Sequence, residues 1–95
     1  MNPPFVIHTT PGFDRMLKQF TKRHPDLAER MAEVFSILSV DPYNLSRRHP
    51  IKKLKDVKPG DGQYRIRLGR WRFRYDIAKQ VVELLYCGLR REDTY

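Results

Sequence analysis

Two short segments of alternating apolar and basic residues, separated by a Gly-Arg dipeptide, constrain this chain most. The segments are Tyr64–Leu68 and Trp71–Tyr75, and the Gly69-Arg70 pair between them has the Gly-X form of a two-residue hairpin turn. Successive side chains of a β-strand point to opposite faces, so each segment predicts one apolar face and one arginine face. A two-residue turn sets Leu68 opposite Trp71, and this register predicts an antiparallel hairpin whose apolar face is available for a core.

The same register predicts a cluster of like charges on the other face of the hairpin. Arg67 falls opposite Arg72, and Arg65 falls opposite Arg74. Like charges that face each other across a sheet destabilise it by a few tenths of a kcal/mol per pair or more. A bound anion would relieve this repulsion, so the pattern predicts a phosphate site. The alternative is four arginines that simply extend into solvent.

The strand expected next along the chain, Val81–Gly88, is predicted to add residues to both faces of the sheet. Val82, Leu84 and Tyr86 are expected to continue the apolar face. Leu85 and Cys87 are expected on the arginine face, where they would form an apolar floor. We interpret Cys87 as a packing residue, because no histidine or other base adjoins it in the sequence.

The N-terminal half predicts a strand and two helices ahead of the hairpin. Thr10-Pro11 is typical of a helix start, and Asp41-Pro42 of a helix end. The expected strands are Phe5–Thr9 and Ile51–Val57, and the expected helical stripes are Phe13, Met16, Leu17 and Phe20, then Leu27, Met31, Val34, Phe35 and Leu38. We therefore predict a single α+β domain over residues 1–95, in which an N-terminal strand and a two-helix hairpin pack on one face of a mostly antiparallel sheet.

The charge of the chain is unevenly distributed. The net charge is +8, and residues 47–95 hold fourteen of the nineteen basic residues but only six of the eleven acidic ones. A one-sided positive field favours a polyanionic partner, nucleic acid foremost, although a solvated basic face is the simpler reading. Cys87 is the only cysteine, which excludes an internal disulfide. We expect a cytoplasmic protein with no membrane span, because the apolar runs are short and no secretory signal is evident.

Sequence motifs for metal or cofactor binding are missing as well. The three histidines show no metal-ligand spacing, and no glycine-rich phosphate loop precedes a helix. We therefore expect any activity of this chain to proceed without a metal ion or an organic cofactor.

Several motifs together resemble the RelE/ParE superfamily of bacterial and archaeal toxins, over almost the whole length of the chain. A two-helix hairpin follows a first strand, as in that superfamily. The matching segments are Lys53-Leu54-Lys55 before a glycine-containing turn, Tyr64-Arg65-Ile66-Arg67, Trp71-Arg72-Phe73-Arg74-Tyr75, and Gly88-Leu89-Arg90-Arg91 with Tyr95 at the end. Their order and spacing are specific only in combination.

The resemblance implies an activity and a set of site residues. The RelE branch consists of endoribonucleases that cut mRNA in the ribosomal A site, and its site residues map onto Arg65, Arg67, Arg72, Arg90 and Tyr95. The completeness of this set favours the RelE branch. Other basic residues are expected to contact the RNA backbone, namely Arg47, Arg48, Lys52, Lys53, Lys55, Arg74 and Arg91.

The resemblance also implies partners: the ribosome, mRNA and a cognate antitoxin, RelB-like or other, in a hetero-oligomer. One departure is notable, because the best-known relatives carry lysine where Arg65 and Arg67 stand here. Arginine stays protonated and cannot act as a general base. The remaining candidates are Tyr95, His49 and, if Tyr95 is the true C-terminus, its α-carboxylate. Two alternatives remain open: a ParE-like inhibitor of DNA gyrase, and a non-catalytic toxin homologue that only binds nucleic acid.

Overall fold

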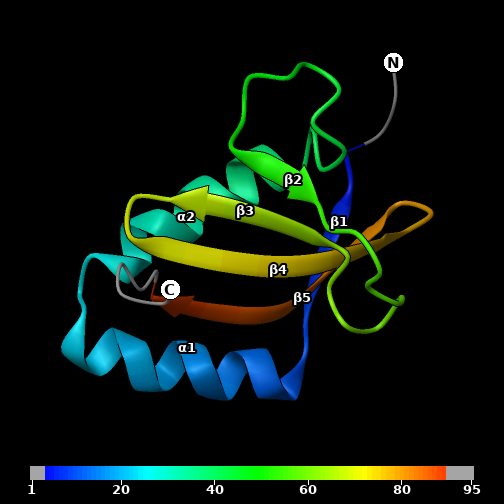
Figure 1. The fold of residues 1–95 in the computed structure, drawn as a ribbon. Helices are drawn as coiled ribbons and strands as arrows, with labels where there is room; N and C mark the ends of the chain where they lie inside the picture. Colours follow the sequence, from blue (N-terminus) through cyan, green and yellow to red (C-terminus); the bar gives the residue numbers. More distant parts are fainter. Residues whose placement is uncertain (1–3, 90–95) are drawn as a thin grey trace.

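The computed structural model describes residues 4–89, which form a five-stranded sheet and two helices (Figure 1). Only the first strand runs parallel to its neighbour, and the other neighbouring pairs are antiparallel. The strands in spatial order are β1 (Val6–Thr9), β5 (Val81–Leu89), β4 (Trp71–Ala78), β3 (Tyr64–Leu68) and β2 (Ile51–Lys53). The predicted α+β class and layout are confirmed.

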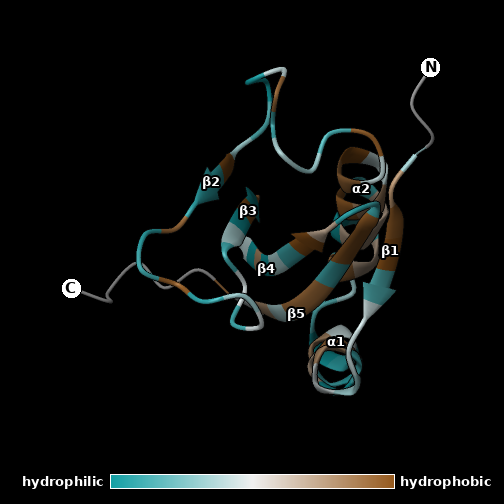
Figure 2. Ribbon diagram, turned by 90° about the vertical axis from the view of Figure 1, so that its right-hand side faces the viewer, coloured by the Kyte–Doolittle hydropathy of each residue, from teal (hydrophilic) through white to brown (hydrophobic). Residues whose placement is uncertain are grey.

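The two helices, α1 (Pro11–Arg23) and α2 (Leu27–Leu38), share one core with the sheet. Thr10 begins α1 as expected, since its hydroxyl accepts a hydrogen bond from the Phe13 backbone N–H at 3.1 Å. Figure 2 shows α2 against one side of the sheet, while the opposite side of β3 and β4 carries no helix. Within residues 4–89, one face of the sheet is therefore left without a covering helix, and we call it the open face.

The hairpin of β3 and β4 has the predicted register. Leu68 pairs with Trp71, Ile66 with Phe73, and Tyr64 with Tyr75 across the two strands. Gly69 has a φ of +60°, a conformation that glycine adopts without a steric penalty. The Tyr75 hydroxyl donates a 2.7 Å hydrogen bond to the backbone carbonyl of Pro42 from within the core. The helices pack against the apolar face of this hairpin.

One strand boundary and the burial of one residue differ from the prediction. The strand expected over Ile51–Val57 ends at Lys53, because the chain turns at the next residues and Asp56 adopts a left-handed φ of +60°. Phe35, expected in the buried stripe of α2, is 42 % exposed. The buried stripe of α2 consists of Leu27, Met31, Val34 and Leu38.

The expected alternation along β5 is wrong beyond Leu84. Tyr75 pairs with Leu84 but Arg74 pairs with Tyr86, so Leu85 is an extra residue that forms a β-bulge. The bulge reverses the alternation: Cys87 is fully buried in the core opposite Phe73, and Tyr86 is exposed on the arginine face. Burial raises the pKa of the Cys87 thiol to about 11, so this thiol is protonated at neutral pH.

Neither helix of the described chain has the length and the apolar character that a membrane span requires.

Candidate nucleic-acid interface

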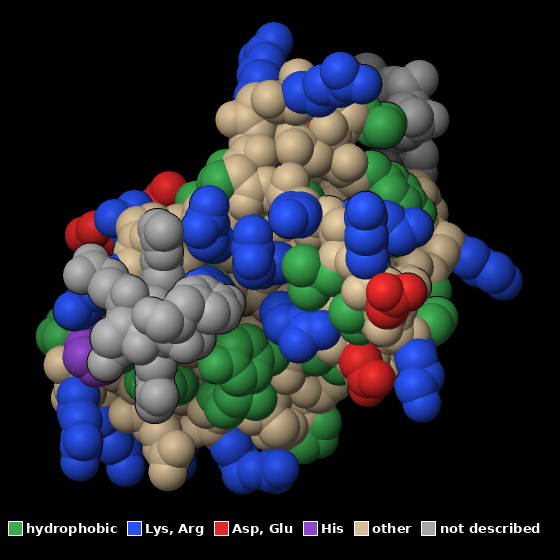
Figure 3. All heavy atoms as spheres, in the orientation of Figure 1, with side chains coloured by type: hydrophobic (Ala, Val, Ile, Leu, Met, Phe, Trp, Pro, Cys, Tyr) green, Lys and Arg blue, Asp and Glu red, His purple; other side chains and the backbone are tan. Residues whose placement is uncertain are grey.

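The open face of the sheet carries five basic side chains in two rows across the strands. The first row is Lys52, Arg65, Arg74 and then Tyr86, from β2 to β5. The second row is Arg67, Arg72 and then Gly88. Figure 3 shows Lys and Arg side chains gathered over this part of the sheet, bordered by hydrophobic ones. We call the set Lys52, Arg65, Arg67, Arg72 and Arg74 the basic face.

The opposed arginines of this face follow the prediction. Arg67 lies opposite Arg72 and Arg65 lies opposite Arg74, and all four side chains are partly buried. Within residues 4–89, Arg67 and Arg72 make no side-chain hydrogen bond or ion pair, and the Nε atom of Arg72 is buried without a partner. Partly buried guanidinium groups with unused N–H donors are suited to bind phosphate oxygens.

Arg74 is held in place by the turn that precedes β3. Its Nε and Nη2 atoms donate hydrogen bonds of 3.2 and 3.0 Å to the carbonyl oxygen of Gly62. Gly62 has a φ of +82°, and a Cβ atom there would lie 2.9 Å from the Cβ of Arg74. A glycine at this position therefore lets the backbone of the turn come close to Arg74. The guanidinium group of Arg74 still has other N–H groups that could bind a ligand.

The carboxylate nearest to these arginines on β4 is engaged by the same turn. Asp76 accepts hydrogen bonds from the backbone N–H groups of Gly60, Gly62 and Gln63 at 2.6, 3.3 and 2.8 Å. Hydrogen bonds from backbone N–H groups satisfy the lone pairs of a carboxylate. Asp76 thus stabilises the turn that precedes β3.

The structure separates the other basic residues that the sequence groups with this site. Lys53 lies on the opposite side of β2, where its Nζ is 5.7 Å from the centre of the Tyr64 ring. Lys55 is exposed in the turn after β2, and Arg47 and Arg48 are exposed in the segment that joins α2 to β2. Lys52 alone of this group lies in the rows. Arg90, Arg91 and Tyr95 lie outside the described residues.

His49, a candidate base, is directed elsewhere. Its Nε2 atom lies 3.7 Å from a carboxylate oxygen of Asp41, which follows α2. Burial alone would raise the pKa of Asp41, but hydrogen bonds from the Ser46 hydroxyl and the N–H groups of Leu45 and Ser46 outweigh it and lower the pKa. The Asp41 carboxylate therefore remains charged beside this histidine.

A polar cluster at the tip of the β3–β4 hairpin was not predicted. Arg70 donates to a carboxylate oxygen of Asp26 at 3.1 Å and lies 3.1 Å from His24 Nδ1, and Trp71 Nε1 donates to the other Asp26 oxygen at 3.0 Å. The hydrogen bonds from Trp71 and then Arg70 lower the pKa of Asp26 to about 2. The cluster ties the hairpin to the connection between the helices. Contacts between residues 44 to 46 positions apart carry no local sequence signal.

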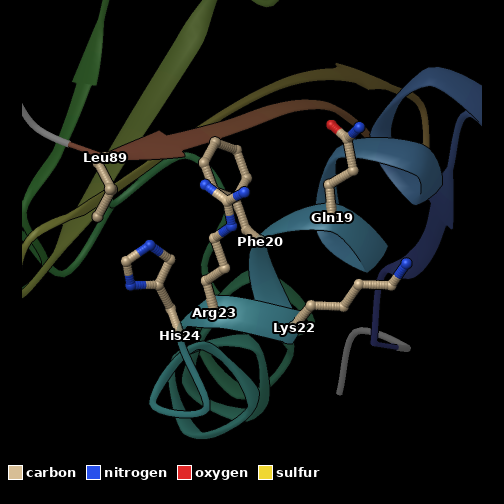
Figure 4. Close-up of a pocket in the computed structure, with 6 residues that line it drawn as sticks. All are labelled: Gln19, Phe20, Lys22, Arg23, His24 and Leu89. Atoms are coloured by element: carbon tan, nitrogen blue, oxygen red, sulfur yellow. The ribbon is translucent and has the colours of Figure 1, made fainter.

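A cavity of about 550 Å³ lies beside this cluster, between the end of α1 and the end of β5 (Figure 4). Lys22, Arg23 and His24 line it on the helical side, and Leu89 lines it from β5. Leu89 pairs with Trp71 and packs against the core. The cavity therefore opens on the helical side of the sheet and is separate from the basic face.

Among residues 4–89, no three His, Cys, Asp or Glu side chains are close enough to hold a metal ion.

Comparison with protein-family models, with curated proteins and with solved structures finds no match to this chain. The resemblance to RelE-like toxins stays a prediction from the sequence.

Proposed function

We propose that this chain is the toxin of a toxin–antitoxin pair, a RelE-like endoribonuclease that cleaves mRNA on the ribosome. The proposal rests on one observation. On the face of β3 and β4 opposite the helices, arginine lies directly across from arginine at two places, Arg67 from Arg72 and Arg65 from Arg74. Folding does not require this arrangement, because like charges directly opposite each other destabilise a sheet. A phosphodiester bound there would be stabilised by the charges that repel one another in its absence.

The proposed chemistry uses a nucleophile that the RNA itself carries. The O2′ atom of a ribose attacks the adjacent phosphorus, the bond from phosphorus to O5′ breaks, and a 2′,3′-cyclic phosphate and a 5′-hydroxyl result. Negative charge grows on the phosphoryl oxygens in the transition state. Guanidinium groups fixed beside those oxygens bind the transition state more strongly than the ground state, and this difference accelerates the reaction.

The structure supports different roles for the four arginines. Arg72 and Arg67 have donors that residues 4–89 leave unused, so we assign the phosphate contacts to them. Arg65 lies next to both Lys52 and Arg74, and we assign to it the orientation of the flanking backbone. The resemblance adds Arg90 to the phosphate contacts.

Two proton transfers accompany this reaction: a base takes one proton from the 2′-hydroxyl, and the leaving O5′ takes one from a solvent water molecule. None of the arginines can accept the first proton, because arginine remains charged in proteins. His49 points toward Asp41 rather than toward the rows of the basic face. We therefore keep Tyr95 as the proposed base.

The test is expression of the wild-type chain and of Arg72→Ala in cells, followed by mapping of mRNA 5′ ends. We expect new ends within translated codons, and a loss of about 100-fold or more in Arg72→Ala, as for removal of other donors to a developing oxyanion. Arg15→Ala is the matched control, since Arg15 is exposed on α1. Circular dichroism checks that both variants fold.

Two outcomes contradict the proposal and identify the alternatives. Intact mRNA together with double-strand DNA breaks indicates a gyrase inhibitor. Salt-dependent binding to RNA without cleavage on ribosomes indicates a non-catalytic nucleic-acid-binding protein.

The proposal includes a cognate antitoxin, RelB-like or other, as a partner in a hetero-oligomer. The net charge of +8 suits a partner segment rich in Asp and Glu. Dependence on the ribosome places the proposed activity in the cytoplasm.

A further inference from the structure

We infer that Tyr86 is a stacking platform for a nucleobase of single-stranded RNA whose phosphates lie on Arg67 and Arg72. The inference deepens the proposed function, and it rests on that proposal for RNA as the ligand. It concerns a residue that the alternation of the sequence assigns to the core.

The bulge at Leu85 brings Tyr86 to the basic face. Without the extra residue, Tyr86 would share the face of Val82 and Leu84, which are fully buried. With it, Tyr86 stands opposite Arg74 and is 43 % exposed. Bulges are frequent beside functional sites because they redirect a side chain in this way.

Because Gly88 has no side chain, the ring of Tyr86 can lie over its backbone. A Cβ atom at Gly88 would collide with the hydroxyl end of Tyr86 and would lie 2.8 Å from its Cζ. The ring therefore extends along β5 over the position of Gly88, which pairs with Arg72. Neighbouring strands are about 4.8 Å apart, so the ring is about one strand spacing from the phosphate-binding row.

The other described tyrosines are not placed for this role. The rings of Tyr43 and Tyr64 are 5.9 Å apart, and those of Tyr64 and Tyr75 are 5.5 Å apart, in a series on the helical side of the sheet. Among the tyrosines of residues 4–89, Tyr86 alone joins the basic face. An exposed aromatic ring beside a row of cations is the combination that binds single-stranded nucleic acid without sequence preference.

Single strands are the ligand that this geometry fits. A base within a duplex already stacks on its neighbours, whereas an unpaired base presents a free π-face to an aromatic side chain. The guanidinium groups would hold the backbone, and the ring would hold one base. Binding should therefore depend on both charge and the presence of the base.

The test measures the affinity of Tyr86→Ala for two short RNA oligomers at low salt by fluorescence anisotropy. One oligomer is unmodified and the other carries abasic sites throughout. We expect Tyr86→Ala to bind the unmodified RNA about 5- to 150-fold more weakly than the wild type. Tyr86→Phe should stay within about twofold, because it keeps the ring. For the abasic RNA, Tyr86→Ala and the wild type should bind equally.

Two further variants refine the test. Tyr43→Ala is the matched control, since Tyr43 is 44 % exposed but lies on the helical side. It should bind both oligomers like the wild type. Gly88→Ala should weaken binding of the unmodified RNA while Tyr86 is still present, because the added methyl group displaces the ring.

Three results would overturn the inference. They are equal affinities of Tyr86→Ala and the wild type for unmodified RNA, an equal loss with both oligomers, and no binding of either oligomer by the wild type. The proposed cleavage has a separate readout. A chain that binds through Tyr86 but cuts no mRNA contradicts the enzymatic proposal alone, and one that cuts mRNA with no effect of Tyr86→Ala on binding contradicts the stacking alone.

Discussion

Single residues of this protein hold elements together through contacts between distant parts of the chain. Asp26 is the clearest case, because its two carboxylate oxygens receive Arg70 and Trp71 from the hairpin tip. The carboxylate lies just before α2 yet forms no side-chain cap there. Its role is to connect the helices with the sheet.

This role predicts a pH dependence of stability for Asp26→Asn. The folded-state pKa of about 2 lies below the ordinary value of 3.8, so Asp26 stabilises the fold above pH 4 and loses this effect as the pH falls toward 2. The free energy of unfolding of Asp26→Asn should lie below that of the wild type at neutral pH, and the gap should close between about pH 4 and pH 2. Urea titrations at each pH measure it.

The control for this prediction is Asp61→Asn, which makes the same change of charge in an exposed turn. It should show no comparable gap at neutral pH. A difference for Asp26→Asn that stays constant down to pH 2 would contradict the assignment.

At the scale of elements, the turn between β2 and β3 depends on β4. Three backbone N–H groups of residues 60–63 donate to Asp76, and the Gly62 carbonyl accepts from Arg74. One strand thus supplies both an acceptor and a donor to a turn that is remote in sequence. The turn in return fixes the direction of an arginine of the basic face.

We expect Asp76→Ala to destabilise this turn. Hydrogen bonds to a charged group contribute about 1.5–3 kcal/mol, and partial exposure of the turn places the expected loss at about 1–2 kcal/mol in free energy of unfolding. Asp61→Ala removes a neighbouring carboxylate that makes no hydrogen bond or ion pair within residues 4–89. It should change the free energy of unfolding by less than about 0.5 kcal/mol. Urea unfolding of both variants decides the comparison, and equal effects would contradict it.

At the scale of the whole molecule, the hydrophobic core and the arginines of β3 and β4 lie on opposite sides of one sheet. The helices cover the apolar face, and the arginines of β3 and β4 occupy the other. The folded protein should therefore be more stable when an anion is bound at the basic face than when none is bound. This property can be measured without knowledge of the reaction.

Pyrophosphate should raise the melting temperature of the wild type at constant ionic strength. A ligand that binds only the folded state stabilises it by about 2.7 kcal/mol at a hundred times its dissociation constant. Arg67→Gln and Arg72→Gln should each reduce this shift, whereas Arg15→Gln on α1 should not. In the absence of the anion and at low salt, Arg67→Gln should melt at or above the wild-type temperature, because it removes one repulsion.

Differential scanning fluorimetry measures both effects. An equal response of the three variants to pyrophosphate would show that the anion does not bind at the opposed arginines.

The sequence by itself determined the hairpin, the helices and the pairing of the arginines. These features follow from local rules: alternation in a strand, an apolar stripe in a helix, and a two-residue turn that sets the register. The predicted register of β3 and β4 is present in the structure at every pair from Tyr64–Tyr75 to Leu68–Trp71. The basic face was predictable for the same reason, except at its edge.

The tertiary structure alone decided which residues border that face. The extra residue at Leu85 is set by how β5 pairs with β4 and with β1, and it exchanges the sides of Tyr86 and Cys87. The short length of β2 and the contacts of Asp26 also depend on partners far away in the chain. Local patterns record the preference of each segment, whereas bulges and long-range hydrogen bonds arise only when the segments pack together.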